Sequence, residues 1–583
     1  MNKSKLIKLL ICAVLAIAAL YIPFDRLGVT INPVEQRVVA MFVFAAFAWI
    51  LEPVPIFSTS ILIIVLMLFT ISNKALTPMM VDANGEKFKN LLSFKDVMAT
   101  WADPTIMLFM GGFFLAAAAT KFKLDLNLAR VLIKPFGKNP KFVLLGMMMT
   151  VAIFSMFMSN TATAAMFLAI LTPVLAVFKP TDKARIAFAL AIPIGCNLGG
   201  MGTPIGTPPN AIAVKALADL GLNISFGQWM LFAVPFMLVM LVFGWFLLLK
   251  LFPPSEKTME LSIAGEFLKT PQAIVVYVTF AVTILLWVFG DLLGLNSNVI
   301  AMIPIAAFTL TGVITAKDLN GMAWDVLWLV AGGFALGLGL QKTGLAAHLL
   351  AAIPFDALPI MVTIFLASFI AIFMSTFMSN SGTAALLAPI MAAAGAVMAA
   401  SPAVDMNIIG GIPGLLCALA FSCSLAMSLP ISTPPNSLAY ATKYVETKDM
   451  AKMGVIIGIV GLVLTVGTMG LLGKVGYFSG VIEAAEKAKA AETAKVEAAA
   501  PAAPAAEATV PAVVDSAKAE AVVDTAAKAE PAPAAEAPKA EAKAEAPKAE
   551  AAAPAEAPKA EAAPAAEAPA PAPEAAPAAE PAK

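Results

Sequence analysis

Ionisable side chains are scarce in this chain outside its last hundred residues. Of its 583 residues, 13% are Asp, Glu, Lys or Arg, 60% are hydrophobic and one is a histidine, His348. A membrane-embedded enzyme would need a nucleophile–base pair or a metal cluster, such as His with Glu, and the apolar segments offer none. We therefore expect that the protein is not an enzyme, and we expect no nucleic-acid partner.

Cysteine is also scarce, and its placement excludes a disulfide framework. Cys12, Cys196, Cys417 and Cys423 all lie in apolar segments, with no spacing typical of metal ligands. We expect four buried free thiols.

Long apolar runs are what the chain has in abundance. They follow one another from Leu6 to Leu472, and a run of roughly 20 residues crosses the hydrocarbon core of a membrane, about 30 Å thick. The pattern predicts an all-α polytopic membrane protein with about eleven transmembrane helices and two re-entrant hairpins. Lys3, Lys5 and Lys8 precede the first run and favour a cytoplasmic N-terminus.

Two polar motifs each occur twice, in the same order. Ser155–Ala165 reads Ser-Met-Phe-Met-Ser-Asn-Thr-Ala-Thr-Ala-Ala, and Ser375–Ala385 reads Ser-Thr-Phe-Met-Ser-Asn-Ser-Gly-Thr-Ala-Ala. A Thr-Pro-Pro-Asn segment follows each of them, at Thr207–Asn210 and Thr433–Asn436. Small polar residues in apolar runs are costly unless they have partners, and two prolines break a helix and free its amides and carbonyls. The repetition indicates an internal duplication with inverted-topology repeats.

The charges that flank the two copies predict that they enter the membrane from opposite sides. Lys138 and Lys141 precede the first copy and Lys179 follows it, and Lys and Arg mark cytoplasmic ends. The second copy has no Lys or Arg near its ends. We predict an inward hairpin at residues 141–178 and an outward hairpin at residues 358–400. Exposed backbone at this depth is tolerated only where it lines a cavity in the protein.

These boundaries divide the chain into five parts. The predicted parts are a first transmembrane helix at residues 1–30, a first repeat at 31–251, a cytoplasmic connection at 252–271, a second repeat at 272–476 and a tail at 480–583. The tail consists mainly of Ala, Pro, Glu and Lys without apolar periodicity, so we expect a solvated spacer that is disordered or fluctuates between helix and polyproline forms. The number of spans predicts that the tail lies outside the cell and that the protein is a multi-pass protein of the inner (plasma) membrane.

The paired motifs resemble those of the divalent anion–sodium symporter family, which includes bacterial dicarboxylate transporters and animal sodium–dicarboxylate, citrate and sulfate carriers. The similarity covers about residues 30–475, and the tail has no counterpart in the family pattern. Ser381 stands where the commonest family pattern has Thr, so the hydroxyl is kept and a methyl group is lost. The resemblance implies a homodimer that works as an elevator, with Na⁺ as the coupling ion at two or more sites.

The resemblance also implies which residues form the site. The implied substrate-binding residues are Asn160, Thr161, Thr207, Asn380, Ser381, Thr433 and Pro434. One sodium ion would bind Ser155, Ser159, Asn160 and the Gly206 carbonyl, and a second would bind Ser375, Asn380 and the carbonyls of Met378, Ser432 and Pro434. Amide and hydroxyl donors near half-helix N-termini suit an anion that has no fixed positive partner.

From this resemblance we expect a sodium-coupled secondary transporter that imports small dicarboxylates, such as succinate, malate and fumarate, across the lipid bilayer. No Lys, Arg or His lies in either hairpin tip or either Thr-Pro-Pro-Asn break. A small dianion at this depth therefore needs cations that travel with it. A sodium-independent dicarboxylate exchanger and a sodium-coupled sulfate or citrate carrier stay open as alternatives.

Overall fold

The protein is described here by a computed structural model that covers residues 3–259, 265–351 and 358–499. In these ranges the regular elements are helices, apart from two isolated β-bridges, Ser72–Leu92 and Val81–Lys87. Eight of the described helical segments are long and apolar enough to cross a membrane. The predicted all-α polytopic membrane fold is confirmed.

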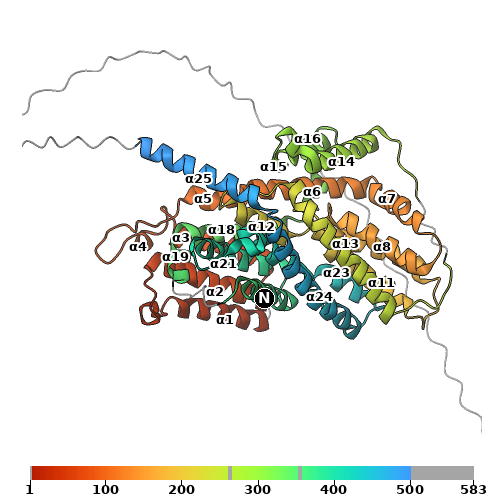
Figure 1. Cartoon of the computed structure of the whole chain (residues 1–583), viewed down its shortest axis with the longest axis horizontal. Coiled ribbons are helices and arrows are strands. Elements are labelled where there is room, and N and C mark those ends of the chain that lie inside the picture. The colour runs from red at the N-terminus through yellow and green to blue at the C-terminus, as the bar shows by residue number, and fades with distance from the viewer. Residues whose placement is uncertain (1–2, 260–264, 352–357, 500–583) are drawn as a thin grey trace, which may run out of the picture. The chain divides into compact units, whose positions relative to one another are not determined.

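The helices of the first half follow the predicted order (Figure 1). They are α1 (Lys3–Ala19), α2 (Pro33–Leu51), α3 (Ile56–Thr70), α4 (Thr77–Met80), α5 (Phe94–Ala99), α6 (Pro104–Lys121), α7 (Leu124–Ile133), α8 (Pro140–Ser155), α9 (Asn160–Ala169), α10 (Leu171–Leu175), α11 (Ala184–Gly200), α12 (Pro208–Ala218) and α13 (Phe226–Leu251). The break between α2 and α3 falls at Glu52, whose φ of 45° ends α2 in the left-handed region.

The second half repeats this series of hairpin and broken helix. Its helices are α14 (Pro271–Phe289), α15 (Ser297–Ile300), α16 (Met302–Leu310), α17 (Ala316–Asn320), α18 (Trp324–Lys342), α19 (Leu345–Ala351), α20 (Ile360–Phe377), α21 (Asn380–Ala400), α22 (Gly411–Leu425), α23 (Pro434–Ala441), α24 (Thr447–Lys474) and α25 (Ser479–Ala499). Residues 260–264 of the predicted connection and residues 500–583 of the predicted tail lie outside the described residues.

The first twenty residues of the predicted tail form a helix, one of the two forms between which we expect this composition to fluctuate. Helix α25 is joined to the membrane part by Phe478, which is 1% exposed and packs edge-on against Phe232 of α13. The neighbouring Tyr477 donates a hydrogen bond from Oη to Gln228 O at 2.7 Å. The Ala, Glu and Lys of this stretch are good helix formers, and aromatic packing at its start fixes where the helix begins.

Both duplicated segments form helical hairpins. Helices α8 and α9 are joined at residues 156–159, and α20 and α21 are joined at residues 378–379. The same serine of each motif caps the second arm, because Ser159 Oγ accepts from Ala162 N (3.2 Å) and Ser379 Oγ accepts from Gly382 N (3.0 Å). The second arm of the first hairpin, α9, has 10 residues, whereas α21 has 21.

Each Thr-Pro-Pro-Asn segment interrupts a helix, as predicted. Helices α11 and α12 are separated by residues 201–207, and α22 and α23 by residues 426–433. In both cases the prolines occupy the first positions of the second helix, where their missing N–H is not needed. The count of about eleven spans requires that each broken pair be counted as one span and that α1, with 17 residues, also cross the membrane. That count stays a prediction.

Close packing of helices brings the hairpins against the broken helices. Helices α8, α11 and α13 contact one another, as do α18, α21 and α12, and each group lies together in Figure 1. Gly199 of α11 has no room for a side chain, since a Cβ there would lie 2.4 Å from Ala152 Cα of α8. Gly332 of α18 meets Ser60 of α3 in the same way, with its added Cβ 2.4 Å from Ser60 Cβ. Small residues at such crossings are typical of helix pairs in membranes.

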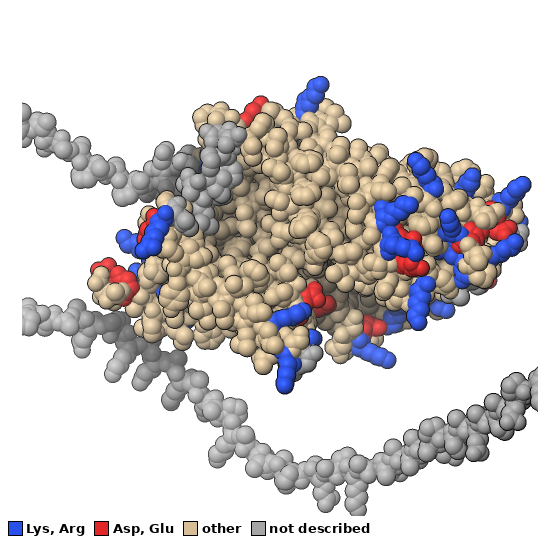
Figure 2. Space-filling model, turned by 90° about the horizontal axis from the view of Figure 1, so that it is seen from below, with Lys and Arg blue, Asp and Glu red and all other residues tan. Residues whose placement is uncertain are grey.

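The surface is apolar in the way that a lipid environment requires. Leu292 and Leu310 are 84% and 86% exposed, and large hydrophobic side chains are exposed along many helices. On the face shown in Figure 2, charged side chains gather toward the edges and a broad area between them carries none. The four cysteines are buried and free, as predicted.

Candidate functional site

A cavity of about 360 Å³ brings together residues from all four repeated motifs. All seven predicted substrate-binding residues line it, namely Asn160, Thr161, Thr207, Asn380, Ser381, Thr433 and Pro434. Ser159, Gly206 and Ser432 from the predicted sodium ligands also line it. The other predicted ligands, Ser155, Ser375 and Met378, are buried behind this lining and are at most 3% exposed. Segments more than 200 residues apart in sequence therefore meet at one site.

Four helix N-termini meet at this cavity. The residues that precede α9, α12, α21 and α23 are Ser159, Thr207, Ser379 and Thr433, and all four line the cavity. The N-terminus of a helix carries a partial positive charge and unpaired amides, so it attracts anions. This wall of the cavity can bind an anion without a Lys or Arg side chain.

A cluster of oxygen atoms lies beside the first hairpin tip. With its amide nitrogen turned toward the cluster, Asn160 donates to Ser155 Oγ (2.7 Å), Gly206 O (3.1 Å) and Cys196 O (3.3 Å). With its amide oxygen turned there instead, Ser155 Oγ still donates to it at 2.7 Å. Two backbone carbonyls then face an acceptor, and only a bound cation would make that arrangement favourable. In the first orientation these oxygens are satisfied within the protein, and the second is the one that a bound cation would favour.

Glycine allows this cluster to be so compact. A Cβ at Gly200 would lie 2.6 Å from Asn160 Oδ1, and a Cβ at Gly206 would lie 2.4 Å from Gly200 O. A larger residue at either position would push the broken helix away from the hairpin tip. The Gly206 carbonyl was predicted as a ligand, whereas the Cys196 carbonyl was not.

The second hairpin has an analogous pair of buried oxygens. Asn380 Oδ1 has no hydrogen-bond partner among the described residues, and Ser375 Oγ, beside the weak donor of the Cys423 thiol, has no hydrogen bond of ordinary geometry. A buried oxygen without a donor costs about 1–3 kcal/mol. A cation bound at either oxygen would remove that cost.

The last residue of each break holds its loop by the same hydrogen bonds. Asn210 Nδ2 donates to Met201 O (3.3 Å) and Thr203 O (2.8 Å), which lie nine and seven residues before it in the sequence. Asn436 Nδ2 donates to two carbonyls at the same sequence separations. Those carbonyls belong to Met427 and Leu429, at 2.8 and 3.0 Å. The asparagines of the two breaks are thus structural counterparts, although the sequence analysis assigned neither a role.

A hydroxyl group also ties each break to the adjacent hairpin tip, but from different positions in the two halves. Thr203 Oγ1 donates to Met156 O and accepts from Gly206 N at 3.1 Å. Ser432 Oγ donates to Thr376 O at 2.9 Å and accepts from Leu429 N at 3.2 Å. The acceptors Met156 and Thr376 stand at the same position of the two motifs. The two halves therefore reach one geometry with different residues, which sequence comparison of the motifs does not reveal.

Asn197 is a cavity residue that the sequence analysis missed. It lies on α11, is fully buried, and donates from Nδ2 to Thr433 Oγ1 and to Asn436 Oδ1, each at 3.2 Å. This bond joins the broken helix of the first half to the break of the second half. The signal was present in the sequence, because Asn197 is a lone polar amide in an apolar helix.

The other lining residues of the cavity come from outside the repeated motifs. They include Pro55, Ile56 and Phe57 at the start of α3, Phe109 and Phe113 of α6, and Asp325, Val326 and Leu329 at the start of α18. These side chains are apolar apart from Asp325. Among the described residues that line the cavity, Asp325 is alone in carrying a charge, and the sequence analysis did not single it out.

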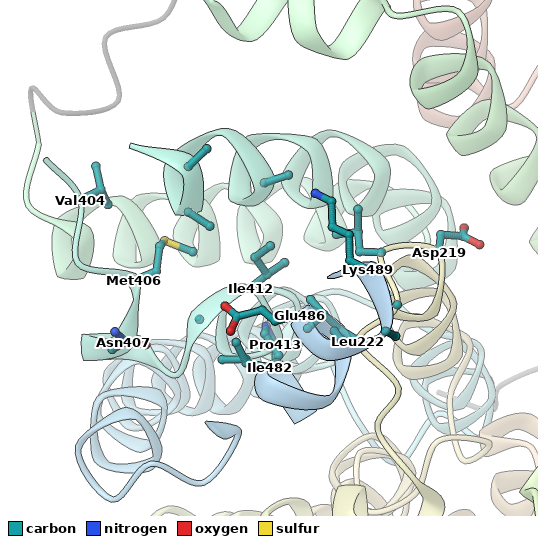
Figure 3. A pocket seen from close by; sticks show the side chains of 18 of the residues that line it. Asp219, Leu222, Val404, Met406, Asn407, Ile412, Pro413, Ile482, Glu486 and Lys489 are labelled. Carbon is teal, nitrogen blue, oxygen red and sulfur yellow. The ribbon is translucent and has the colours of Figure 1, made fainter. Parts of the chain in front are cut away.

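A second and larger cavity, of about 810 Å³, lies beside α25 (Figure 3). Its lining carries the carboxylates of Asp219, Asp405 and Glu486 together with Lys489, and Ile482 of α25 lies among them. Three carboxylates make it unsuited to an anion. The smaller cavity is therefore the candidate site.

A His–Glu pair does occur in the structure, contrary to the expectation from sequence. His348 Nδ1 lies 3.0 Å from Glu35 Oε2. Glu35 also accepts from Asn32 N at 3.0 Å as part of the cap of α2, and neither residue lines the candidate cavity. The pair is thus at a helix end and does not form a catalytic site with the motifs. Among the described residues, no group of three or more His, Cys, Asp or Glu side chains could hold a metal ion.

Removing the hydroxyl group that bonds each helix break to the adjacent hairpin tip should destabilise the protein. Thr203→Val and Ser432→Ala each remove the hydroxyl that donates to a buried carbonyl and accepts from a backbone amide, which we expect to cost about 1–3 kcal/mol. Thermal unfolding of the detergent-purified protein should show a lower midpoint for both variants. Thr203→Ser keeps the hydroxyl and is the control, so equal midpoints for Thr203→Val and Thr203→Ser would contradict this role.

Comparison with known proteins agrees with this geometry. Residues 3–475 match the family described as the sodium:sulfate symporter transmembrane region. An uncharacterized transporter of Haemophilus influenzae is 29% identical over 452 residues, which are 73% of this chain and 90% of that protein. The sodium-dependent dicarboxylate transporter SdcS of Staphylococcus saprophyticus is 26% identical over 468 residues, or 72% of this chain and 83% of that protein.

A third relative transports a different anion. The inorganic phosphate transporter PHO87 of Saccharomyces cerevisiae is 30% identical over 332 residues, covering 55% of this chain and 34% of that protein. The family match spans most of the chain and includes both hairpins and both breaks. The chain is a multi-pass membrane transporter that belongs to the sodium:sulfate symporter family, which confirms the predicted resemblance to divalent anion–sodium symporters.

Proposed function

We propose that this protein is a sodium-coupled importer of small dicarboxylates. The observation that carries the proposal is the lining of the 360 Å³ cavity, where hydroxyl and amide groups from both halves surround a space that four helix N-termini face. Two separate donor sets, Asn160–Thr161 and Asn380–Ser381, suit an anion with two separated charges, such as succinate. The staphylococcal relative is named for the same activity.

Sodium is the proposed coupling ion because the cavity lacks a fixed positive charge. Among the described lining residues there is no Lys, Arg or His. Moving a bare dianion out of water costs several kcal/mol per charge. The oxygen clusters at Ser155–Asn160 and Ser375–Asn380 offer two sites for cations that would enter with the anion and leave with it.

The transport cycle is proposed to move one wall of the cavity past the other. The hairpins and broken helices form the polar wall, and α3, α6 and α18 form the apolar wall. The boundary between these two sets of helices would allow the hairpins and broken helices to slide as a unit, as in an elevator. We propose that this happens in each protomer of a homodimer. Inverted repeats give such a carrier two related end states.

We propose that the described conformation is inward-facing. With the N-terminus in the cytoplasm, the starts of α3 and α18, which line the cavity, lie on the cytoplasmic side, and the C-terminal tail lies outside. On the outer side, Lys215 of α12 pairs with Asp103 Oδ2 (3.4 Å) at the start of α6 and with Asp219. This ion pair joins the polar wall to α6 and would have to break when the outer side opens.

Single-cysteine labelling tests this topology. In a cysteine-free background, Thr181→Cys should react only with membrane-permeant reagents and Ala403→Cys should also react with impermeant reagents added outside intact cells. The two positions flank the two hairpins, which we propose enter from opposite sides. Labelling of both by the impermeant reagent would exclude inverted hairpins.

Uptake of labelled succinate into proteoliposomes tests the function itself. We expect uptake under an inward sodium gradient, and little or none when potassium or choline replaces sodium. Asn160→Ala and Asn380→Ala should each reduce sodium-driven uptake by about 100-fold or more, because each residue would contact both anion and cation. Sulfate, citrate and phosphate are tested in parallel, since the family description and the yeast relative name two of them.

The controls separate the alternatives. A protein that needs succinate inside the vesicle, and works equally in sodium and choline, would be an exchanger. Sodium-driven uptake of sulfate or citrate without uptake of succinate would assign a different substrate to the same site. Folding of the two alanine variants is checked by gel filtration and thermal unfolding.

A further inference from the structure

We propose that Asp325 enforces the coupling by repelling a dianion whose charge has not been neutralised by bound cations. The inference rests on the proposed function and adds to it a residue outside the repeated motifs. Asp325 stands in the first turn of α18 and lines the same cavity as the hairpin tips. It is the one charged side chain among the described residues that line the cavity.

The carboxylate of Asp325 is not neutralised within the protein. No hydrogen bond or ion pair joins it to any of the described residues, in contrast to Asp103 at the start of α6, which pairs with Lys215 at 3.4 Å. Its neighbours in the cavity lining, Val326 and Leu329, are apolar. Asp325 is itself exposed, so water screens part of its charge, and the rest acts on an anion that enters the cavity it lines.

A negative charge is unexpected at a site that must bind an anion. It has a role if it distinguishes an anion bound together with sodium from an anion bound alone. The four helix N-termini attract a dianion whether or not sodium is bound. A dianion alone meets Asp325 with two like charges, whereas a dianion with two sodium ions is neutral and meets no net repulsion. Asp325 therefore opposes the uncoupled passage of the anion and leaves the neutral complex unaffected.

A structural role for Asp325 is the competing explanation. Acidic residues in the first turn stabilise a helix through its dipole, and Asp325 has that position in α18. Loss of such a stabilising effect would reduce the amount of folded protein and would lower uptake equally with and without sodium. Loss of charge discrimination would instead raise the sodium-free uptake specifically. The two roles predict opposite results.

The test compares Asp325→Asn with Asp325→Glu in proteoliposomes. We measure initial uptake of labelled succinate with sodium at saturation and with choline in its place. For Asp325→Asn we expect the ratio of sodium-free to sodium-driven uptake to rise at least about fivefold, since one like-charge contact is removed. Asp325→Glu keeps the charge and should keep the wild-type ratio. Asp325→Ser is a second neutral variant if Asn disturbs folding.

A charge series provides the second readout. Monomethyl succinate, succinate and tricarballylate carry about one, two and three charges, and their binding to purified protein is measured in choline. If Asp325 acts by repulsion, the factor by which Asp325→Asn tightens binding should grow with each added charge. Equal factors for all three anions, or a ratio of sodium-free to sodium-driven uptake in Asp325→Asn as low as that of wild type, would overturn the inference.

These outcomes are distinct from failure of the proposed function. Wild-type protein that takes up succinate without sodium would refute the symport proposal whatever the variants do. Wild-type protein that binds none of the anions would refute both, because the inference requires an anion in the cavity.

Discussion

The structure depends on one electrostatic constraint, which is that an anion must lose its hydration at a site inside the membrane part of the protein. The described residues that line the cavity provide no fixed positive side chain. What they provide is partial charge, from hydroxyls, amides and four helix N-termini. In the proposed function, partial charges attract a dianion without holding it irreversibly, and mobile cations balance its full charge. Breaking two helices and turning two hairpins is how the chain produces these N-termini away from its surface.

The two halves of the chain line the cavity with the same motifs, but some of the supporting hydrogen bonds come from different positions in each half. Asn210 and Asn436 hold the two breaks by corresponding hydrogen bonds, whereas Thr203 and Ser432 make equivalent ties from different positions. Asn197 has no counterpart of its kind, since Cys423 takes the corresponding place in the second half. A duplicated sequence thus supplies the architecture, and single substitutions in each copy adapt it to one shared site.

Much of the fold and site followed from the sequence, for physical reasons. Long apolar runs interrupted by small polar residues have few solutions in a membrane, so the hairpins and the breaks could be predicted. The seven residues that line the cavity were implied by the family resemblance of the same motifs. Asp325 and the aromatic wall of Phe109 and Phe113 could not, because they come from helices without a repeated motif and meet the tips only through tertiary packing. The start of helix α25 was also missed, since composition alone does not show that Tyr477 and Phe478 fix it.

Equilibrium binding of labelled succinate to the purified protein tests most directly whether mobile cations replace a fixed positive charge. Sodium is exchanged stepwise for choline at constant ionic strength, so that screening does not change. The account predicts that succinate affinity rises with sodium, with a slope of about two or more on logarithmic axes, as expected when at least two ions bind with the anion. Affinity that is the same in sodium and in choline would contradict it.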